Sequence, residues 1–199
     1  MIRDAKPVFE RREKMQLTYN VRNTHRAVGT RFSSEITRLY GMKNLAEDHV
    51  HVRLRGSAGQ SLGAFLCQGI TLEVFGDAND YVGKGLSGGT IIVRPTVSSP
   101  LVSQDNSIIG NTVLYGATAG RLFAAGQAGE RFAVRNSGAH VVVEGCGSNG
   151  LEYMTGGIAV ILGRVGSNFG AGMTGGMKPM RTPKISSGSG WIVCIGKSN

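Results

Sequence analysis

Short apolar runs that each begin at a glycine recur along the chain, and this repeat constrains the fold more than any other feature. Successive runs start 20, 31, 18, 19 and 19 residues apart, and the long interval contains the turn-forming stretch Pro95–Asp105. A strand rises about 3.3 Å per residue and glycine permits positive φ, so the common spacing suits one rung of about three short strands joined by tight turns. The runs are Gly69–Gly76, Gly89–Arg94, Gly120–Gly126, Gly138–Gly145 and Gly157–Gly163, and Gly176 would begin another. The repeat predicts an all-β chain folded as a single-stranded β-solenoid.

The segments between the runs repeat as well, because each combines a bulky residue, small residues and a final pair of glycines. Residues 81–89, 151–157 and 169–176 follow this pattern, which identifies them as equivalent corners. Residues 71–74 and 140–144 partly alternate apolar and polar side chains, as strands with one inward face do. The glycines expected to shape the corners are Gly83, Gly85, Gly88, Gly89, Gly156, Gly157, Gly170, Gly172, Gly175 and Gly176.

Glycine content also divides the chain. The 31 glycines among 199 residues exceed the roughly 7% of average usage, but residues 1–48 hold only Gly29 and Gly41. We expect residues 1–48 to be a short mixed segment that leads into the solenoid and caps its first rung, with a helix over residues 33–40 preceded by a hydroxyl residue as a candidate cap. Residues 49–176 form the glycine-rich β-helix domain. Residues 177–199 are basic and divergent, and we expect a poorly ordered tail in which only residues 191–195 could form a strand.

The net charge of +9 is concentrated at the two ends of the chain. Residues 1–55 carry 12 basic and 6 acidic side chains, residues 56–177 carry 6 and 7, and residues 178–199 carry 4 and 0. A protein that binds nucleic acid shows a continuous basic face with aromatic stacking platforms. The nearly neutral body therefore argues against nucleic acid as a partner.

Secretion and membrane insertion are not indicated either. Residues 1–7 lack the apolar stretch of a signal peptide, and no run approaches the roughly 18 apolar residues of a membrane helix. Cys67, Cys146 and Cys194 are far apart and form no CxxC pair, which argues against a disulfide framework and a zinc site. We expect a soluble, reduced protein of the cytoplasm or an organelle stroma.

Several motifs that resemble catalytic or ligand sites have structural explanations. A GxGxxG pattern occurs at residues 83–88 and again at 170–175, but a strongly β segment follows the first where a dinucleotide site requires a helix. His49 and His51 share one face of a predicted strand without further metal ligands. Asp77–Asp80 has the residue types of a turn, and Cys67 lies in an apolar stretch that would leave its thiol unreactive. We expect no catalytic centre and no metal site.

Four segments of this sequence, residues 23–31, 53–60, 76–89 and 129–138, closely resemble the C-terminal glycine-rich (GXGXG) domain of glutamate synthase large (alpha) subunits. The resemblance covers roughly residues 15–176 in the expected order and spacing. It implies a right-handed β-helix packed between an N-terminal glutaminase domain and an FMN-binding synthase barrel. The spacing of the repeat does not define this handedness, so the resemblance alone supplies it.

The resemblance also implies a part in nitrogen assimilation. In that family, glutamine yields ammonia that is channelled to 2-oxoglutarate, and reduction of the resulting imine at FMN gives glutamate. The catalytic amino-terminal cysteine, the FMN site and the iron–sulfur cysteines belong to other domains, so this chain is expected to bind no cofactor and to act as a scaffold. Contacts with those domains are expected among the polar and basic residues that precede the repeats, namely Asn23, His25, Arg26, Arg31, Arg53, Arg55 and Gln60.

Alternatives to a scaffold of glutamate synthase remain open. Related glycine-rich β-helices also occur as separate subunits, so the chain could be a stand-alone interaction module or a subunit of another oxidoreductase complex. The sequence does not specify the electron donor, NAD(P)H or ferredoxin, or whether the chain is a separate protein or a piece of a longer one. An exposed terminal rung makes self-association a further expectation.

Overall fold

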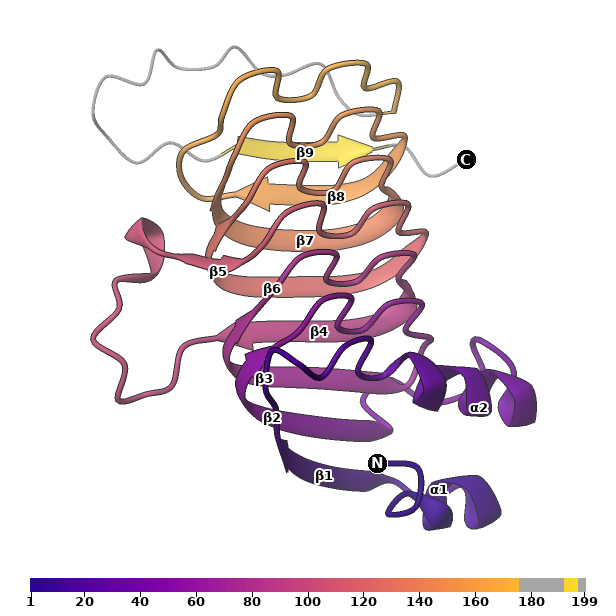
Figure 1. The fold of residues 1–199 in the computed structure, drawn as a ribbon. Helices are drawn as coiled ribbons and strands as arrows, with labels where there is room; N and C mark the ends of the chain where they lie inside the picture. Colours follow the sequence, from indigo (N-terminus) through magenta and orange to yellow (C-terminus); the bar gives the residue numbers. More distant parts are fainter. Residues whose placement is uncertain (176–191, 197–199) are drawn as a thin grey trace.

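The computed structural model describes residues 1–175 and 192–196. A parallel sheet of eight strands dominates the fold (Figure 1). The neighbours in the sheet are β1, β2, β3, β4, β6, β7 and β8 in this order, and the short β5 pairs with both β3 and β6. The parallel strands are β1 (Met15–Asn20), β2 (Val50–Ala58), β3 (Ile70–Ala78), β4 (Ser87–Arg94), β5 (Ser107–Ile109), β6 (Ala119–Ala128), β7 (Ser137–Cys146) and β8 (Gly156–Ile161). An antiparallel strand, β9 (Ile192–Gly196), lies beside β8.

The repeat in the sequence corresponds to the register of this sheet. Thr71 pairs with Thr90, Arg121 with His140, and His140 with Ile158, so neighbouring strands are 19, 19 and 18 residues apart in the chain. Because consecutive strands run in the same direction, the chain must return from the end of each strand to the start of the next. The glycine-led runs that were predicted to be strands therefore lie next to one another in one sheet.

The return loops are stacked in step with the strands. The main-chain N–H of Leu114 donates to the carbonyl of Val82 at 2.8 Å, and that of Ala133 donates to Val113 at 2.8 Å. A further bond from Leu151 to the carbonyl of the preceding loop is 2.7 Å long. Hydrogen bonds therefore join each loop to the loop before it, as they join each strand to its neighbour.

The core lies between the sheet and the return loops. Two rows of side chains in register point inward from the strands, and every member is buried. The first row is Val52, Leu72, Ile91, Leu122, Val141 and Ala159, and the second is Leu54, Val74, Val93, Ala124, Val143 and Ile161. Buried loop residues, among them Leu62, Val82, Val113 and Phe132, belong to the same cluster. One apolar core thus runs the length of the sheet.

One return segment is longer than the others, as the 31-residue interval in the sequence suggested. Phe75 pairs with Arg94 and Ala78 pairs with Ile109, so three residues of β3 lie opposite fifteen residues of the next turn. Residues 95–106 are the excess, and they project from the sheet as an arm that contains the short 3-10 helix η1 (Ser103–Asp105). The arm exposes Val97, Leu101 and Val102.

Two helices lie at the N-terminal end of the molecule, α1 (Lys6–Arg11) and α2 (Thr30–Tyr40). Phe9 of α1 packs against Phe32 of α2 with 5.4 Å between ring centroids, and the Tyr40 hydroxyl donates to the carbonyl of Val8 at 2.7 Å. None of the helices among the described residues has the length and apolarity needed to cross a lipid bilayer.

The structure differs from the expected boundaries at this end. The predicted helix starts at residue 30 instead of 33, and its first turn follows Gly29 with no side-chain cap. The Ser33 hydroxyl instead donates to the carbonyl of Phe65 at 2.8 Å. The strand β1 lies within residues 1–48, so the sheet begins before the glycine-rich runs do. No glycine begins β1, and this strand therefore lacked the signal of the repeat.

The predicted corner glycines occupy two kinds of position. Gly83, Gly85, Gly170 and Gly172 lie in return loops with φ between +62° and +70°. The paired glycines lie in strands instead of turns. Gly88 and Gly89 belong to β4, and Gly156 and Gly157 begin β8. Gly175 packs close to the carbonyl of Thr155 in the turn below. Gly176 and most of the expected tail, 177–191 and 197–199, lie outside the described residues.

Candidate functional site

Four of the seven predicted contact residues gather at the first corner of the molecule. Asn23, His25 and Arg26 lie in the exposed segment between β1 and α2. The main-chain N–H of Ala27 donates to the carbonyl of Gln60 at 2.9 Å, which places that segment against the end of β2. This corner therefore presents exposed polar side chains on a main chain held by hydrogen bonds.

The other three predicted contact residues lie apart from this corner. Arg31 is exposed in the first turn of α2, whereas Arg53 and Arg55 are exposed on β2. The Nε of Arg53 lies 3.5 Å from a carboxylate oxygen of Glu73. Arg53 thus already has an acidic neighbour within the chain.

A charged cluster surrounds Glu73 on the outer face of the sheet. His51 Nε2 lies 3.1 Å from one carboxylate oxygen of Glu73, Arg94 lies 2.9 Å from the other, and His51 Nδ1 lies 2.8 Å from Asp48. The Arg94 guanidinium also stacks over the ring of Phe75 at 4.4 Å. Burial alone would raise the pKa of Glu73, but the hydrogen bonds from Arg94 and His51 outweigh it and lower that pKa. A carboxylate paired on both oxygens is suited to holding strands together and poorly suited to proton transfer.

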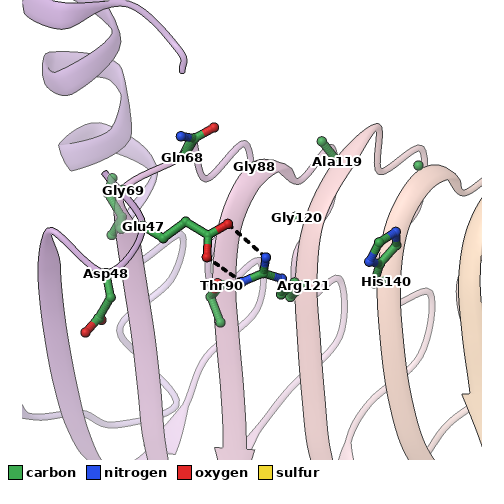
Figure 2. A pocket seen from close by; sticks show the side chains of 12 residues that line it. Glu47, Asp48, Gln68, Gly69, Gly88, Thr90, Ala119, Gly120, Arg121 and His140 are labelled. Atoms are coloured by element: carbon green, nitrogen blue, oxygen red, sulfur yellow. Dashed lines mark hydrogen bonds and ion pairs between the residues drawn. The ribbon is translucent and has the colours of Figure 1, made fainter. Parts of the chain in front are cut away.

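A groove of about 180 Å³ crosses the strands near their starts (Figure 2). Glu47, which precedes β2, forms a two-point ion pair with Arg121 of β6, with both N–O distances 2.8 Å. These hydrogen bonds lower the pKa of Glu47. His140 lines the groove on the neighbouring strand β7, and within the described residues no hydrogen bond links it to a hydroxyl or a carboxylate. Nucleophilic catalysis needs a base in hydrogen-bond reach of its nucleophile, so this arrangement does not form a catalytic pair.

A second groove, of about 370 Å³, lies at the ends of β2, β3 and β5, with Asn23 among its lining residues. Its acidic side chain, Asp77, accepts a hydrogen bond from the Ser57 hydroxyl at 3.1 Å. The Asn79 side chain accepts from the N–H of Asp80 at 2.7 Å. Asp and Asn side chains commonly make such local hydrogen bonds in turns. The groove therefore presents no cluster of acidic side chains among its described lining residues.

The outer face of the sheet changes character between β3 and β4. Across β1, β2 and β3, one row in register reads Thr18, Arg53 and Glu73, and it continues across β4, β6, β7 and β8 as Ile92, Phe123, Val142 and Val160. Phe123 is 41% exposed, and the other three apolar members are partly buried. We call Ile92, Phe123, Val142 and Val160 the apolar strip.

The apolar strip was not predicted from the sequence, although the sequence contains a signal for it. Residues 91–93 and 158–161 are uninterrupted apolar runs, and so is the centre of 140–144, where the polar residues stand only at the two ends. Residues 140–144 therefore differ from residues 71–74, with which they were grouped as partly alternating. Continuous apolar runs are typical of parallel strands that are covered on both faces. The contrast between these strands and β3 could have identified the strip.

Two features of the described residues bear on cofactor binding, namely the placement of possible metal ligands and the glycine patterns. No group of three or more His, Cys, Asp or Glu side chains in this part of the chain is placed to hold a metal. Cys67 and Cys146 are buried in different turns, whereas an iron–sulfur cluster requires several converging thiolates. The glycine pattern at residues 83–88 continues directly into β4, so it lacks the helix N-terminus that would receive a flavin or dinucleotide phosphate.

These features define a class of protein, namely a glycine-rich repeat built on a stacked parallel sheet, with charged groups paired to one another and an apolar outer strip. The comparisons with known proteins agree with that class. The family described as "GXGXG motif" matches residues 1–185, and the chain belongs to this family.

Several glutamate synthases are close relatives of this chain. The chain is 76% identical over 163 residues to the glutamate synthase [NADPH] large chain of Azospirillum brasilense, a match that covers 82% of this chain and 11% of that protein. It is 52% identical over 179 residues to the glutamate synthase [NADPH] large chain of Bacillus subtilis, covering 90% of this chain and 12% of the relative. It is 55% identical over 160 residues to ferredoxin-dependent glutamate synthase 2 of Synechocystis, covering 80% and 10%.

The homologues are therefore segments of glutamate synthase large chains, as the resemblance implied, and the chain spans about a tenth of their length. These relatives differ in the electron donor that their names give, NADPH in two and ferredoxin in the third. Similarity in this region does not distinguish the donors.

Proposed function

We propose that this chain is a structural part of a glutamate synthase, which converts glutamine and 2-oxoglutarate into two molecules of glutamate. In this proposal the chain positions the glutaminase domain and the FMN-binding synthase domain and contributes no catalytic group. The observation that carries it is the 76% identity to a glutamate synthase large chain over 82% of this chain. The pairing of Glu73 and Glu47 with arginines supports a structural role, because paired carboxylates favour fixed geometry over proton transfer.

The proposal includes the form of the scaffold, a right-handed single-stranded β-helix. Its support is that each strand pairs in parallel with the strand one turn later and each return loop bonds to the loop of the preceding turn. Right-handed crossovers are also the strong general preference for parallel strands. Such a rigid body transmits a fixed spacing between whatever is docked to its two ends and faces.

Cofactors and location follow from the same proposal. FMN and the iron–sulfur cluster are assigned to the partner synthase domain, and the separated, buried Cys67 and Cys146 support that assignment. We propose a cytoplasmic location, where cysteines stay reduced. The corner with Asn23, His25, Arg26 and Gln60 is proposed as one contact with a neighbouring domain, and Arg31, Arg53 and Arg55 as further contacts.

The experiment that tests this function is co-purification. Tagged chain is mixed with a glutamate synthase large chain from which the matching region has been deleted, and the complex is isolated by size exclusion. The proposal predicts one complex in which flavin absorbance follows the large chain and the tagged chain alone is colourless. Capture of a different oxidoreductase from the source cells, with no affinity for the deleted large chain, would favour the alternative of an independent interaction module.

A further inference from the structure

The polar and apolar halves of the outer sheet face are organised differently. In β2 and β3 the outward side chains satisfy one another, because Arg53 and His51 both contact Glu73. In β4, β6, β7 and β8 the same register row holds the apolar strip, in which Ile92 pairs with Phe123, Phe123 with Val142, and Val142 with Val160. The strip is therefore one contiguous surface across four neighbouring strands.

A surface of this composition is unusual for a parallel sheet that faces solvent. Parallel sheets occur almost only where both faces are covered, and contiguous apolar patches on a protein surface mark sites of association. The core and the return loops cover the inner face of this sheet, whereas Phe123 on the outer face keeps 41% of its area exposed. The strip has the character of a surface that is buried in a larger assembly.

The side chains that border the strip define what the partner must offer. Arg121 and His140 lie two residues before Phe123 and Val142 on the same strands, so they face outward along one margin of the strip. Glu47 already pairs with Arg121, whereas His140 is exposed and makes no side-chain hydrogen bond within the described part of the chain. An apolar centre with a polar margin is the usual anatomy of a protein interface.

We propose that the apolar strip is the docking face for another domain of the glutamate synthase large chain, one with an apolar surface bordered by a carboxylate or other acceptor opposite His140. This inference rests on the proposed function. The occupant is assigned to the same large chain because the aligned region covers only 11% of one matched relative and 12% of another, so most of each relative lies outside it. We therefore infer that one of the domains that accompany this region in the relatives packs against the strip.

The test measures binding between this chain and the large chain deleted for the matching region, with variants of one residue. Phe123→Asp places a charge in the centre of the strip and should weaken binding about tenfold or more, because central aromatic residues dominate interface energies. Phe123→Leu keeps the apolar surface and should bind within about threefold of the unmodified chain. Tyr153→Asp is the matched control, because it introduces the same charge in place of another exposed aromatic residue, which lies in a return loop away from the strip and from the predicted contact residues.

The outcomes separate failure of the inference from failure of the proposed function. Thermal unfolding of each variant should match the unmodified chain, since Phe123 is a partly exposed surface residue. If the unmodified chain binds and Phe123→Asp binds equally well, or if Tyr153→Asp loses as much affinity, the strip is not the docking face although the function stands. If the unmodified chain does not bind at all, both fail. If the chain alone forms a dimer that Phe123→Asp dissociates, the occupant is a second copy and the inference is wrong.

Discussion

Left-handed main-chain positions recur at alternate residues of the return loops, whether or not glycine occupies them. Arg131, Ala133 and Arg135 have φ of +56°, +54° and +56°, close to the +64° and +62° of Gly83 and Gly85 in an earlier loop. A left-handed residue other than glycine costs about 1–2 kcal/mol. Stacking on the neighbouring loops must offset that cost, so contacts between the loops hold these residues in a backbone conformation that is otherwise unfavourable for them.

Two glycines separate the effect of φ from the effect of close packing between turns. Gly138 has no positive φ, but a Cβ there would collide with the carbonyl oxygen of Thr118, whereas Gly116 has φ of +65° and open space around it. We expect Gly138→Ala to lower the free energy of unfolding by about 3 kcal/mol through overpacking, and Gly116→Ala by about 1 kcal/mol through its backbone conformation. Urea unfolding of both variants checks this. Equal losses would show that the turns can move apart at Gly138.

The charged cluster makes stability depend on pH through Glu73. Its pKa is lowered in the folded state, so its ionised form favours folding above its ordinary value near 4.5, and that contribution is lost as pH falls through the folded pKa. Glu73→Gln should therefore lower the free energy of unfolding by about 1–2 kcal/mol at pH 7 and have little effect near pH 3. Denaturant unfolding at both pH values measures the difference. A loss that is the same at both would assign it to packing instead of charge.

At the scale of elements, the sequence predicted most of the sheet and missed what lacks the glycine-led pattern. The run Gly69–Gly76 corresponds to β3, and Gly138–Gly145 to β7, because glycine and apolar residues mark each turn of the repeat. The strand β1 has no leading glycine, so the repeat did not identify it, although Met15, Leu17 and Tyr19 alternate with polar residues as they do in a strand with one inward face. The uninterrupted apolar runs indicate strands that are covered on both faces, but a single run does not show which of its side chains face outward.

The arm formed by residues 95–106 should be dispensable for folding. Its removal would leave Arg94 followed by Ser107, which restores the three-residue step between the partners of Phe75 and Ala78. Because loop-closure entropy changes slowly with length, we expect the deletion variant to fold with a thermal midpoint within a few degrees of the unmodified chain. Circular dichroism during heating measures this. An insoluble or unfolded variant would mean that the arm supports β5 and the turn beneath it.

At the scale of the whole molecule, the described residues form a layered body in which each strand of the parallel sheet pairs with the strand of the next layer. The strands are stacked side by side, with α1 and α2 at one end of the stack and β8 and β9 at the other (Figure 1). The apolar strip, the arm and the first corner lie at different places on this stack, so several neighbours could contact it at once. The structural role proposed above requires such separate contact surfaces.

The measurement that tests the structural role most directly is glutamine-dependent glutamate formation by a large chain lacking the matching region, assayed with and without this chain. We predict that the deleted large chain is inactive or nearly so, that adding this chain restores glutamate formation, and that this chain alone turns over neither glutamine nor 2-oxoglutarate. Turnover by the purified chain alone, or binding without any restored activity, would contradict the structural role.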